Sequence, residues 1–162
     1  MEKKIEKEIK NLMKLLKKKG LFLATMESCT GGALINAITN IPGASEITKG
    51  GIVAYSTEQK IYFGVPKEKI NKYSVYSKEV AIEMAKIAQK KFNSQIGVGI
   101  TGVLSRKDPN YPEKEIGKVY FAIAFFERIF CEEIKIKPQK SREKEKTKII
   151  LEILKSLKKI LS

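Results

Sequence analysis

The segment spanning residues 21–39 places a buried strand directly before a helix. Residues 21–26, Leu-Phe-Leu-Ala-Thr-Met, are mostly apolar, as in a buried strand, and residues 33–39 are typical of a helix. A strand that turns directly into a helix leaves backbone N–H groups unpaired, and Ser28 and Thr30 are suited to cap them. The two glycines that follow let the backbone approach a ligand closely. Open α/β sheets bind ligands at such turns, so this segment predicts both a fold class and a candidate site.

The rest of the chain alternates between further helix and strand patterns. Amphipathic helices are predicted over residues 5–16, 77–92 and beyond Pro138, and strands over 50–56, 95–101, 118–126 and 128–136, the last two forming a hairpin. Ser56 to Gln59 fits a capping box and predicts a helix that starts at Thr57, whereas loops are expected at 67–76 and 103–117. These elements predict a single domain over residues 1–162, a three-layer α/β/α sandwich with a mixed sheet of about five strands.

The carboxyl ends of the first three predicted strands bring polar residues to one edge of this sheet. They are Ser28, the segment from Tyr55 to Lys60, and Thr101-Gly102. Parallel strands end at the same edge, where open α/β sheets bind ligands, so these residues form the candidate site.

The chain contains no histidine, which limits the chemistry available at this edge. Ser-His-Asp triads, Cys-His dyads and metal sites with histidine ligands are excluded. A serine nucleophile needs a base, and Lys60 is the candidate, because the first turn of a helix and partial burial both favour its neutral amine. The backbone N–H groups around Thr30, Gly31 and Gly32 can hold an oxyanion or a phosphate, and Tyr55 can relay a proton or orient the lysine.

The same residues also have structural interpretations. Ser28 can serve purely as a helix cap, Lys60 can be a solvated surface lysine, and Tyr55 can be a ring in the core. The residues alone favour a cap or a binding turn over catalysis. Cys29 is a rival nucleophile. A small buried residue is nevertheless its expected role, because a cysteine without a histidine lacks its usual activator.

The formal net charge of +14 lies mainly in the two terminal segments. Residues 1–20 carry +5 and residues 137–162 carry +6. Both segments show helical periodicity, and neither contains an aromatic residue for base stacking. Solvated Lys/Glu helix faces are therefore favoured over a nucleic-acid binding surface.

Membrane and secretory signals are also missing from the sequence. No apolar run approaches the roughly 20 residues needed to span a bilayer, and the N-terminal residues lack the apolar core of a signal peptide. Two cysteines, Cys29 and Cys131, are too few for a disulfide framework. We therefore expect a cytoplasmic protein without a membrane partner.

A series of short motifs runs through the chain. They are Glu27-Ser-Cys-Thr-Gly-Gly32, Ile41-Pro-Gly-Ala-Ser45, Gly50-Gly-Ile-Val-Ala-Tyr-Ser56 with Glu58 and Lys60, Gly64-Val-Pro66, Ser77-Lys-Glu-Val-Ala81, Thr101-Gly102 and Pro112-Glu-Lys-Glu-Ile-Gly117. Together they resemble the CinA carboxyl-terminal family, and the first motif followed by Tyr-Ser-x-Glu-x-Lys is highly specific. The similarity extends from about Leu21 to the last predicted helix, where Arg142 falls at the family's late arginine.

The resemblance implies a fold and a reaction. The family has an α/β/α sandwich with a mixed five-stranded sheet, and its reaction is the hydrolysis of nicotinamide mononucleotide to nicotinic acid mononucleotide and ammonia. The resemblance also implies that Ser28 is the nucleophile and Lys60 the base, assisted by Tyr55, with no metal and no cofactor. The residues expected to bind the substrate are Glu27, Cys29, Thr30, Gly31, Gly32, Thr101, Gly102 and Arg142. We expect this nucleotide and further copies of the chain as partners, and no upstream pyrophosphatase domain as in larger CinA proteins.

The loop after Thr101-Gly102 departs from the family pattern. Where the family has a glycine-rich run, residues 103–111 read Val-Leu-Ser-Arg-Lys-Asp-Pro-Asn-Tyr. Arg106 and Lys107 can offer side-chain charge to a substrate phosphate, since guanidinium binds phosphate oxygens in bidentate fashion, or both can be exposed loop cations. Two other functions stay open. One is a non-catalytic nucleotide-binding module, and the other is a nucleic-acid-associated competence factor.

Overall fold

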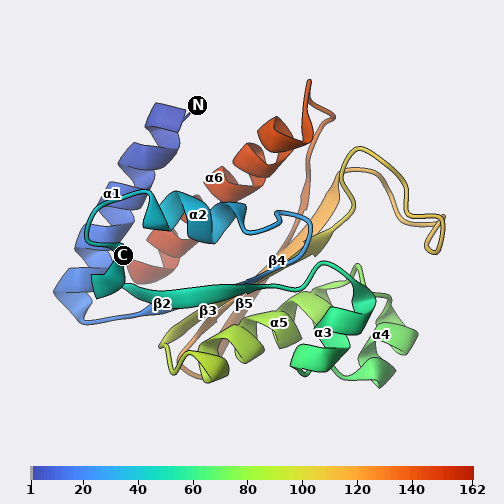
Figure 1. Cartoon of the computed structure of the whole chain (residues 1–162), viewed down its shortest axis with the longest axis horizontal. Helices are drawn as coiled ribbons and strands as arrows, with labels where there is room; N and C mark the ends of the chain where they lie inside the picture. Colours follow the sequence, from blue (N-terminus) through green and yellow to red (C-terminus); the bar gives the residue numbers. More distant parts are fainter. Residues whose placement is uncertain (1) are drawn as a thin grey trace.

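A mixed five-stranded sheet carries helices on both faces in a computed structural model that describes residues 2–162 (Figure 1). The strands are β1 (Leu23–Glu27), β2 (Thr48–Val53), β3 (Ile96–Gly102), β4 (Lys118–Phe125) and β5 (Arg128–Lys135). The helices are α1 (Glu2–Lys19), α2 (Ala33–Thr39), α3 (Thr57–Phe63), α4 (Lys67–Tyr73), α5 (Lys78–Lys91) and α6 (Arg142–Leu161), with a short 3-10 helix η1 (Ala44–Glu46). This arrangement confirms the predicted three-layer α/β/α sandwich.

The strand order places the carboxyl ends of three parallel strands at one edge of the sheet. The order is β2-β1-β3-β4-β5, in which β1 runs parallel to β2 and β3, while β4 is antiparallel to β3 and β5. Parallel neighbours need crossover connections, and here α2 joins β1 to β2, while the helices α3 to α5 join β2 to β3. The edge at which β1, β2 and β3 end is the edge predicted for the site.

Hydrophobic core residues cover both faces of the sheet. Helices α1, α2 and α6 pack on one face, and α3, α4 and α5 pack on the other (Figure 1). On the first face α1 and α6 also pack against each other, so the two basic terminal segments share one layer of the molecule. The apolar residues that these two helices bury are Ile9, Leu12, Met13, Leu16, Ile149, Ile150, Ile153, Leu154, Leu157 and Leu161. Full burial of one such side chain contributes about 1.5–3 kcal/mol, so this layer is a major source of stability.

The structure differs from the sequence prediction mainly in one region. Residues 67–76, expected to be a loop, contain helix α4, and this expectation was wrong because α4 buries only Ile70 and so shows no apolar period. Strand β2 spans Thr48–Val53 and not residues 50–56. The hairpin of β4 and β5 and the loop over 103–117 are confirmed. Within residues 2–162 the structure has no helix with the length and apolarity needed to cross a membrane.

Candidate active site

Ser28 is the first residue after β1, and the neighbouring strand β3 fixes its backbone. Its N–H group donates a hydrogen bond to the Ile100 carbonyl at 3.1 Å. Its side chain is 4% exposed. The residue therefore lies at the carboxyl end of the middle one of the three parallel strands and is almost fully buried.

Glu27, the last residue of β1, holds the start of helix α2. Its Oε2 accepts hydrogen bonds from the Thr30 hydroxyl at 2.6 Å and the Leu34 N–H at 3.1 Å, and its Oε1 accepts from the Ile35 N–H at 2.9 Å. The expectation that Ser28 and Thr30 cap this helix was wrong, because the N-cap position has no side-chain hydrogen bond and the buried Glu27 carboxylate supplies the acceptors instead. A negative charge at a helix N-terminus is also favoured by the helix dipole. These contacts give Glu27 a structural role that needs no ligand.

We expect Glu27→Gln to lower the free energy of unfolding by about 2 kcal/mol. The amide turns an NH₂ group toward N–H and O–H donors, so at least one buried donor loses its acceptor. Chemical denaturation followed by circular dichroism measures the change. Glu46→Gln is the matched control, because Glu46 is 61% exposed and makes a surface ion pair with Lys17. Such pairs contribute only about 0–1 kcal/mol, so equal effects of the two substitutions would contradict the capping role of Glu27.

Lys60 reaches Ser28 from helix α3. The Ser56 hydroxyl caps this helix by accepting a hydrogen bond from the Gln59 N–H at 3.1 Å, which fixes the first turn. The Lys60 Nζ donates to Ser28 Oγ at 2.8 Å and to the Tyr55 carbonyl at 3.0 Å. The structure thus brings together the two residues that the sequence placed on separate elements.

The surroundings of Lys60 favour its neutral amine. Its side chain is 1% exposed, and burial lowers its pKa from 10.5 to about 8. No carboxylate opposes this shift of the pKa, and only the nearby Cys29 raises it. At pH 7 a pKa of about 8 leaves roughly one amine in ten neutral, against about one in 3,000 at the ordinary value. Lys60 can therefore accept a proton near neutral pH.

Cys29 is poorly suited to act as the nucleophile. Burial raises the pKa of its thiol to about 12, although the positive charges of Lys60 and Arg142 lower it in part. The thiol stays protonated at neutral pH, and the thiolate is the nucleophilic form of cysteine. This environment favours Ser28 over Cys29.

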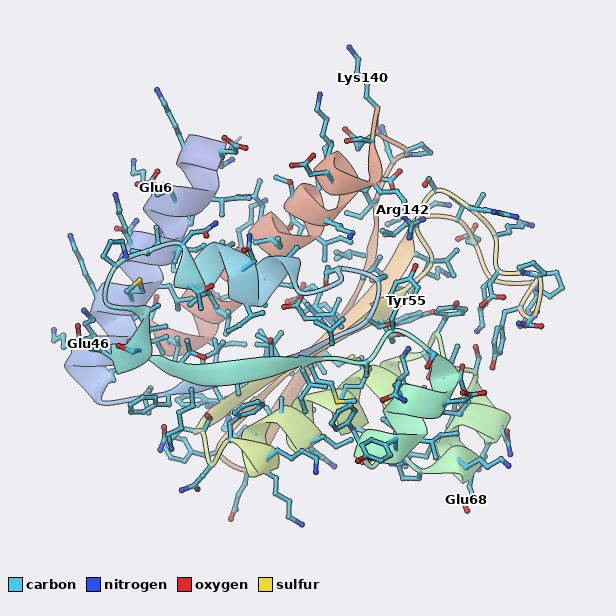
Figure 2. The ribbon with its side chains drawn as sticks, in the orientation of Figure 1. Glu6, Glu46, Tyr55, Glu68, Lys140 and Arg142 are labelled. Carbon is cyan, nitrogen blue, oxygen red and sulfur yellow. The ribbon has the colours of Figure 1, made fainter. Side chains whose placement is uncertain are left out.

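Tyr55 contacts the pair through its backbone and not through its ring. Its carbonyl oxygen accepts the Lys60 hydrogen bond and lies 3.4 Å from Ser28 Oγ, so the main chain orients the lysine. The alternative interpretation of Tyr55 as a core ring was wrong, because Tyr55 is 63% exposed and its hydroxyl accepts a hydrogen bond from Arg142 at 3.4 Å (Figure 2). Among the residues described, this hydroxyl makes no hydrogen bond to Ser28 or Lys60, as a proton relay would require.

The turn between β1 and α2 presents backbone N–H groups beside Ser28. Gly31 and Gly32 have φ values of 60° and 90°, in the left-handed region that favours glycine. The Gly31 N–H donates to the Ser28 carbonyl at 2.9 Å and is therefore occupied. The N–H groups of Cys29, Thr30 and Gly32 have no hydrogen-bond partner within residues 2–162. These three groups are the donors available to an oxyanion.

Thr101 and Gly102 have packing roles at the end of β3. The buried Thr101 hydroxyl donates to the Val75 carbonyl at 3.0 Å. A Cβ on Gly102 would lie 2.7 Å from the Val119 Cα in β4, so a side chain has no room there. Arg106 is exposed on the following loop and, in the part of the chain that the structure describes, makes no hydrogen bond or ion pair. Among the residues described, none of these three makes a hydrogen bond to Ser28.

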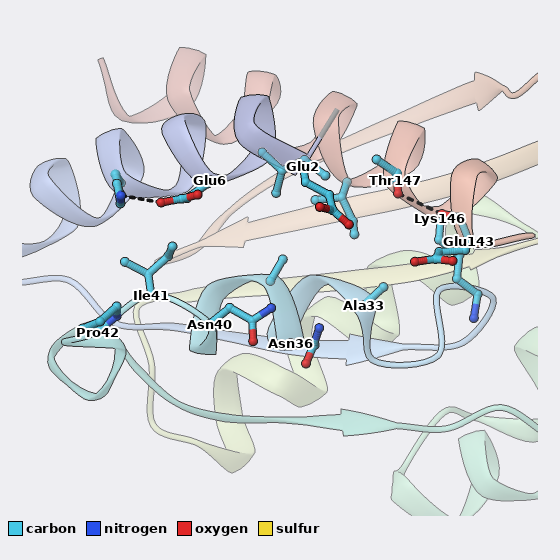
Figure 3. A pocket seen from close by; sticks show the side chains of 14 residues that line it. Glu2, Glu6, Ala33, Asn36, Asn40, Ile41, Pro42, Glu143, Lys146 and Thr147 are labelled. Carbon is cyan, nitrogen blue, oxygen red and sulfur yellow. Dashed lines mark hydrogen bonds and ion pairs between the residues drawn. The ribbon is translucent and has the colours of Figure 1, made fainter.

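Lys146 is a second cation beside the Ser28 turn, and the sequence did not single it out. Its Nζ lies 3.1 Å from the point that a Cβ on Gly31 would occupy. Lys146 follows Arg142 by four residues in α6, and this spacing, which places two side chains on one helix face, was the available signal. Lys146 also borders a groove of about 580 Å³ between α1, α2 and α6 (Figure 3), whose lining includes Ala33, Asn36, Glu143 and Thr147.

The assembled geometry is suited to acyl transfer by a serine with an amine base. A hydroxyl lies within hydrogen-bond distance of a buried amine whose pKa is lowered to about 8, and free N–H groups lie on the adjoining turn. Arg142 and Lys146 add positive charge next to that turn. Among residues 2–162, no three Cys, Asp or Glu side chains are grouped as a metal site would need.

The family of the CinA C-terminal domain matches this chain over residues 5–161. A CinA-like protein from Flavobacterium psychrophilum is 44% identical over 124 residues, which are 75% of this chain and 29% of that protein. A CinA-like protein from Kosmotoga olearia is 42% identical over 113 residues, which are 69% of this chain and 27% of that protein. The chain thus spans less than a third of the length of these curated relatives.

Solved structures share the fold. A competence-damaged protein (CinA) superfamily protein from Klebsiella pneumoniae superposes with a TM-score of 0.91 at 22% identity, over 97% of both chains. The competence/damage inducible protein CihA from Agrobacterium tumefaciens gives a TM-score of 0.85 at 27% identity, over 95% of both chains. These likenesses agree with the α/β sandwich described above.

Proposed function

The chain belongs to the CinA C-terminal domain family, and from this premise we propose that it hydrolyses the carboxamide of nicotinamide mononucleotide. The products are nicotinic acid mononucleotide and ammonia. The observation that carries the proposal is the buried hydrogen bond of 2.8 Å between the Lys60 amine and Ser28 Oγ. A serine paired with a lysine of lowered pKa is a recurring arrangement for attack on amides.

The first half of the reaction forms an ester on Ser28. Neutral Lys60 takes the hydroxyl proton as Ser28 Oγ bonds to the carboxamide carbon, and the carbonyl oxygen becomes an oxyanion. The N–H groups of Cys29, Thr30 and Gly32 are the donors that stabilise it. When the oxyanion collapses, the C–N bond breaks, and the Lys60 ammonium gives its proton to the leaving nitrogen, which departs as ammonia.

The second half returns the enzyme to its starting state. A water molecule gives a proton to Lys60 as its oxygen bonds to the ester carbon, and a second oxyanion forms in the same place. Its collapse breaks the bond to Ser28 Oγ, which recovers the proton from Lys60, and the nicotinic acid mononucleotide leaves. The Tyr55 carbonyl holds the Lys60 amine at 3.0 Å in the resting site and so keeps it directed at Ser28.

Arg142 and Lys146 suit the phosphate of a mononucleotide. Both lie beside the Ser28 turn, Arg142 against the exposed Tyr55 hydroxyl and Lys146 against Gly31. A phosphate monoester carries up to two negative charges, and charge-assisted hydrogen bonds from guanidinium and ammonium groups hold it strongly.

A non-catalytic nucleotide-binding module is the second candidate, and the altered loop at residues 103–111 favours it. The two functions differ in one observable, the release of ammonia from nicotinamide mononucleotide by the purified protein. Ammonia together with an equal amount of nicotinic acid mononucleotide supports the enzyme. Saturable binding of the nucleotide without either product supports the module, and absence of both binding and turnover contradicts both functions.

Arg142 and Arg106 are the two arginines that could bind the substrate phosphate, and substituting each in turn distinguishes between them. We expect Arg142→Ala to weaken binding of nicotinamide mononucleotide by about 1.5–3 kcal/mol, the scale of a hydrogen bond to a charged group. Binding of the phosphate-free riboside should stay unchanged. Arg106→Ala is the matched variant, and the same selective loss there would assign the phosphate to the loop at residues 103–111. Calorimetric titration of both ligands measures this, and equal losses for the two ligands would show that neither arginine recognises the phosphate.

A further inference from the structure

Asp108 is the only aspartate in the chain, and the loop over 103–117 is organised around it. Its Oδ2 accepts a hydrogen bond from the Tyr76 hydroxyl at 2.5 Å, and its Oδ1 accepts from the Asn110 N–H at 2.9 Å. Its backbone carbonyl accepts from the Tyr111 N–H at 3.0 Å. One residue therefore turns the loop and also ties it to the segment before α5.

The segment that receives this tie is itself firmly held. The Tyr76 N–H donates to Ser74 Oγ at 3.1 Å, and the Ser77 hydroxyl caps α5. The Val75 carbonyl accepts the hydrogen bond from Thr101 at the end of β3. The Tyr76 hydroxyl thus anchors the loop to a part of the backbone that is bonded to the central sheet.

The Tyr111 ring adds a second contact at the same place. It packs edge-on against the Tyr76 ring, with centroids 5.3 Å apart and an interplanar angle of 78°. Such aromatic pairs contribute about 0.5–1.5 kcal/mol beyond the area they bury. The hydrogen bond and the ring contact together form what we call the Tyr76–Asp108 latch.

The latch is connected to the backbone beside Ser28 through the end of β3. Thr101, which bonds the segment next to Tyr76, directly follows Ile100, whose carbonyl accepts the Ser28 N–H. Burial and the Asp108 hydrogen bond both raise the pKa of Tyr76, so its hydroxyl stays protonated and remains a donor to Asp108. The loop that the latch fixes begins at Val103, directly after β3, and so starts at the edge of the sheet where Ser28 lies.

We propose that the Tyr76–Asp108 latch positions the loop over 103–117 as one wall of the substrate site and thereby sets the affinity for the mononucleotide. This inference rests on the proposed function, and it makes Tyr76 and Asp108 positioning residues. Neither side chain hydrogen-bonds to Ser28 or Lys60 within residues 2–162, so bond-making steps do not use them. The latch supplies order to a loop that contains no glycine between Val103 and Ile116.

The test compares Tyr76→Phe and Asp108→Asn with wild type in the deamidation of nicotinamide mononucleotide. Tyr76→Phe keeps the ring pair and removes only the hydroxyl. We expect a KM about tenfold higher, which corresponds to about 1.4 kcal/mol, with kcat within about twofold of wild type. Tyr73→Phe is the matched control, since Tyr73 lies on the preceding helix and its hydroxyl makes no hydrogen bond among the residues described. It should change neither constant.

Two further measurements separate positioning from general destabilisation. The double variant should raise KM no more than Asp108→Asn alone, because both single substitutions remove the same Tyr76–Asp108 hydrogen bond. Hydrogen exchange of the Asn110 and Tyr111 amides should become faster in both single variants and stay unchanged in Tyr73→Phe. A loss of kcat together with a lower unfolding midpoint would instead indicate a purely structural contact and would overturn the proposal.

The remaining outcomes are also decisive. An active Tyr76→Phe enzyme with an unchanged KM overturns the latch and leaves the proposed function intact. If the wild-type protein releases no ammonia, the proposed function fails, and the latch is then judged by the dissociation constant of nicotinamide mononucleotide. A roughly tenfold weaker affinity in both variants supports the latch in that case, and equal affinity or no binding by wild type overturns it.

Discussion

Ser28→Ala is expected to lower kcat for nicotinamide mononucleotide by about 10⁴-fold or more, while the fold and the affinity for the nucleotide stay close to wild type. The substitution removes the oxygen that would form the ester, and no other group on the turn can replace it. Lys60 keeps its hydrogen bond to the Tyr55 carbonyl, so the amine stays in place. Ammonia release measures kcat, and calorimetric titration of the nucleotide measures the affinity.

Cys29→Ala is the matched control, one residue further along the same turn. The buried Cys29 thiol has a pKa raised to about 12 and takes no part in the proposed reaction. Its loss should leave kcat within about threefold of wild type, with the small change that follows from losing one buried sulfur atom. If Cys29→Ala abolished turnover and Ser28→Ala did not, the nucleophile would have to be reassigned.

Lys60→Met is expected to lower kcat/KM by at least about 10²-fold, the contribution of a general base. Methionine is unbranched and apolar, so it fits the nearly closed site without burying a new polar group. Because only the neutral amine accepts the Ser28 proton, kcat/KM of the wild-type enzyme should rise with pH and reach half of its maximum near pH 8, where the lysine titrates. The variant should lack this rise.

The pH profile also gives the outcomes that would contradict the amine base. Lys60→Arg is the matched variant, because guanidinium stays protonated and cannot accept the proton, so it should be as inactive as Lys60→Met. A wild-type profile that is flat between pH 6 and pH 9 would remove Lys60 from the role of base. A strict requirement for an added divalent metal ion would contradict the mechanism in the same way.

The helices and strands that the sequence predicts are those whose apolar residues recur with the period of the element and are buried in the structure. Residues 77–92 show a helical period and begin with a serine, and they form α5 with Ser77 as its cap. The apolar run after Gln95 becomes the fully buried strand β3. Helix α4 escaped prediction because its sequence is polar and its one buried residue, Ile70, sets no period.

The predictable parts of the site follow from the topology. Ser28 and Lys60 come together because the turns after β1 and β2 meet at one edge of the sheet, as for any pair of neighbouring parallel strands. The Tyr55 carbonyl could not be foreseen, since backbone atoms carry no residue-specific signal. The capping role of Glu27 and the place of Lys146 depend on how the chain folds back on the turn, which the spacing along the sequence does not specify.

The packing of α6 beside α1 has a consequence for how the protein is made. Helix α6 leaves the ribosome after every other element of the described fold, yet it covers the same face of the sheet as α1, one of the first to emerge. Until then the apolar stripe of α1 lacks its neighbour, and such exposed surface makes a nascent chain prone to aggregation. Arg142 and Lys146 arrive with α6 as well. The Ser28 site therefore acquires its full set of charges only once α6 has packed beside α1 and covered this face of the sheet.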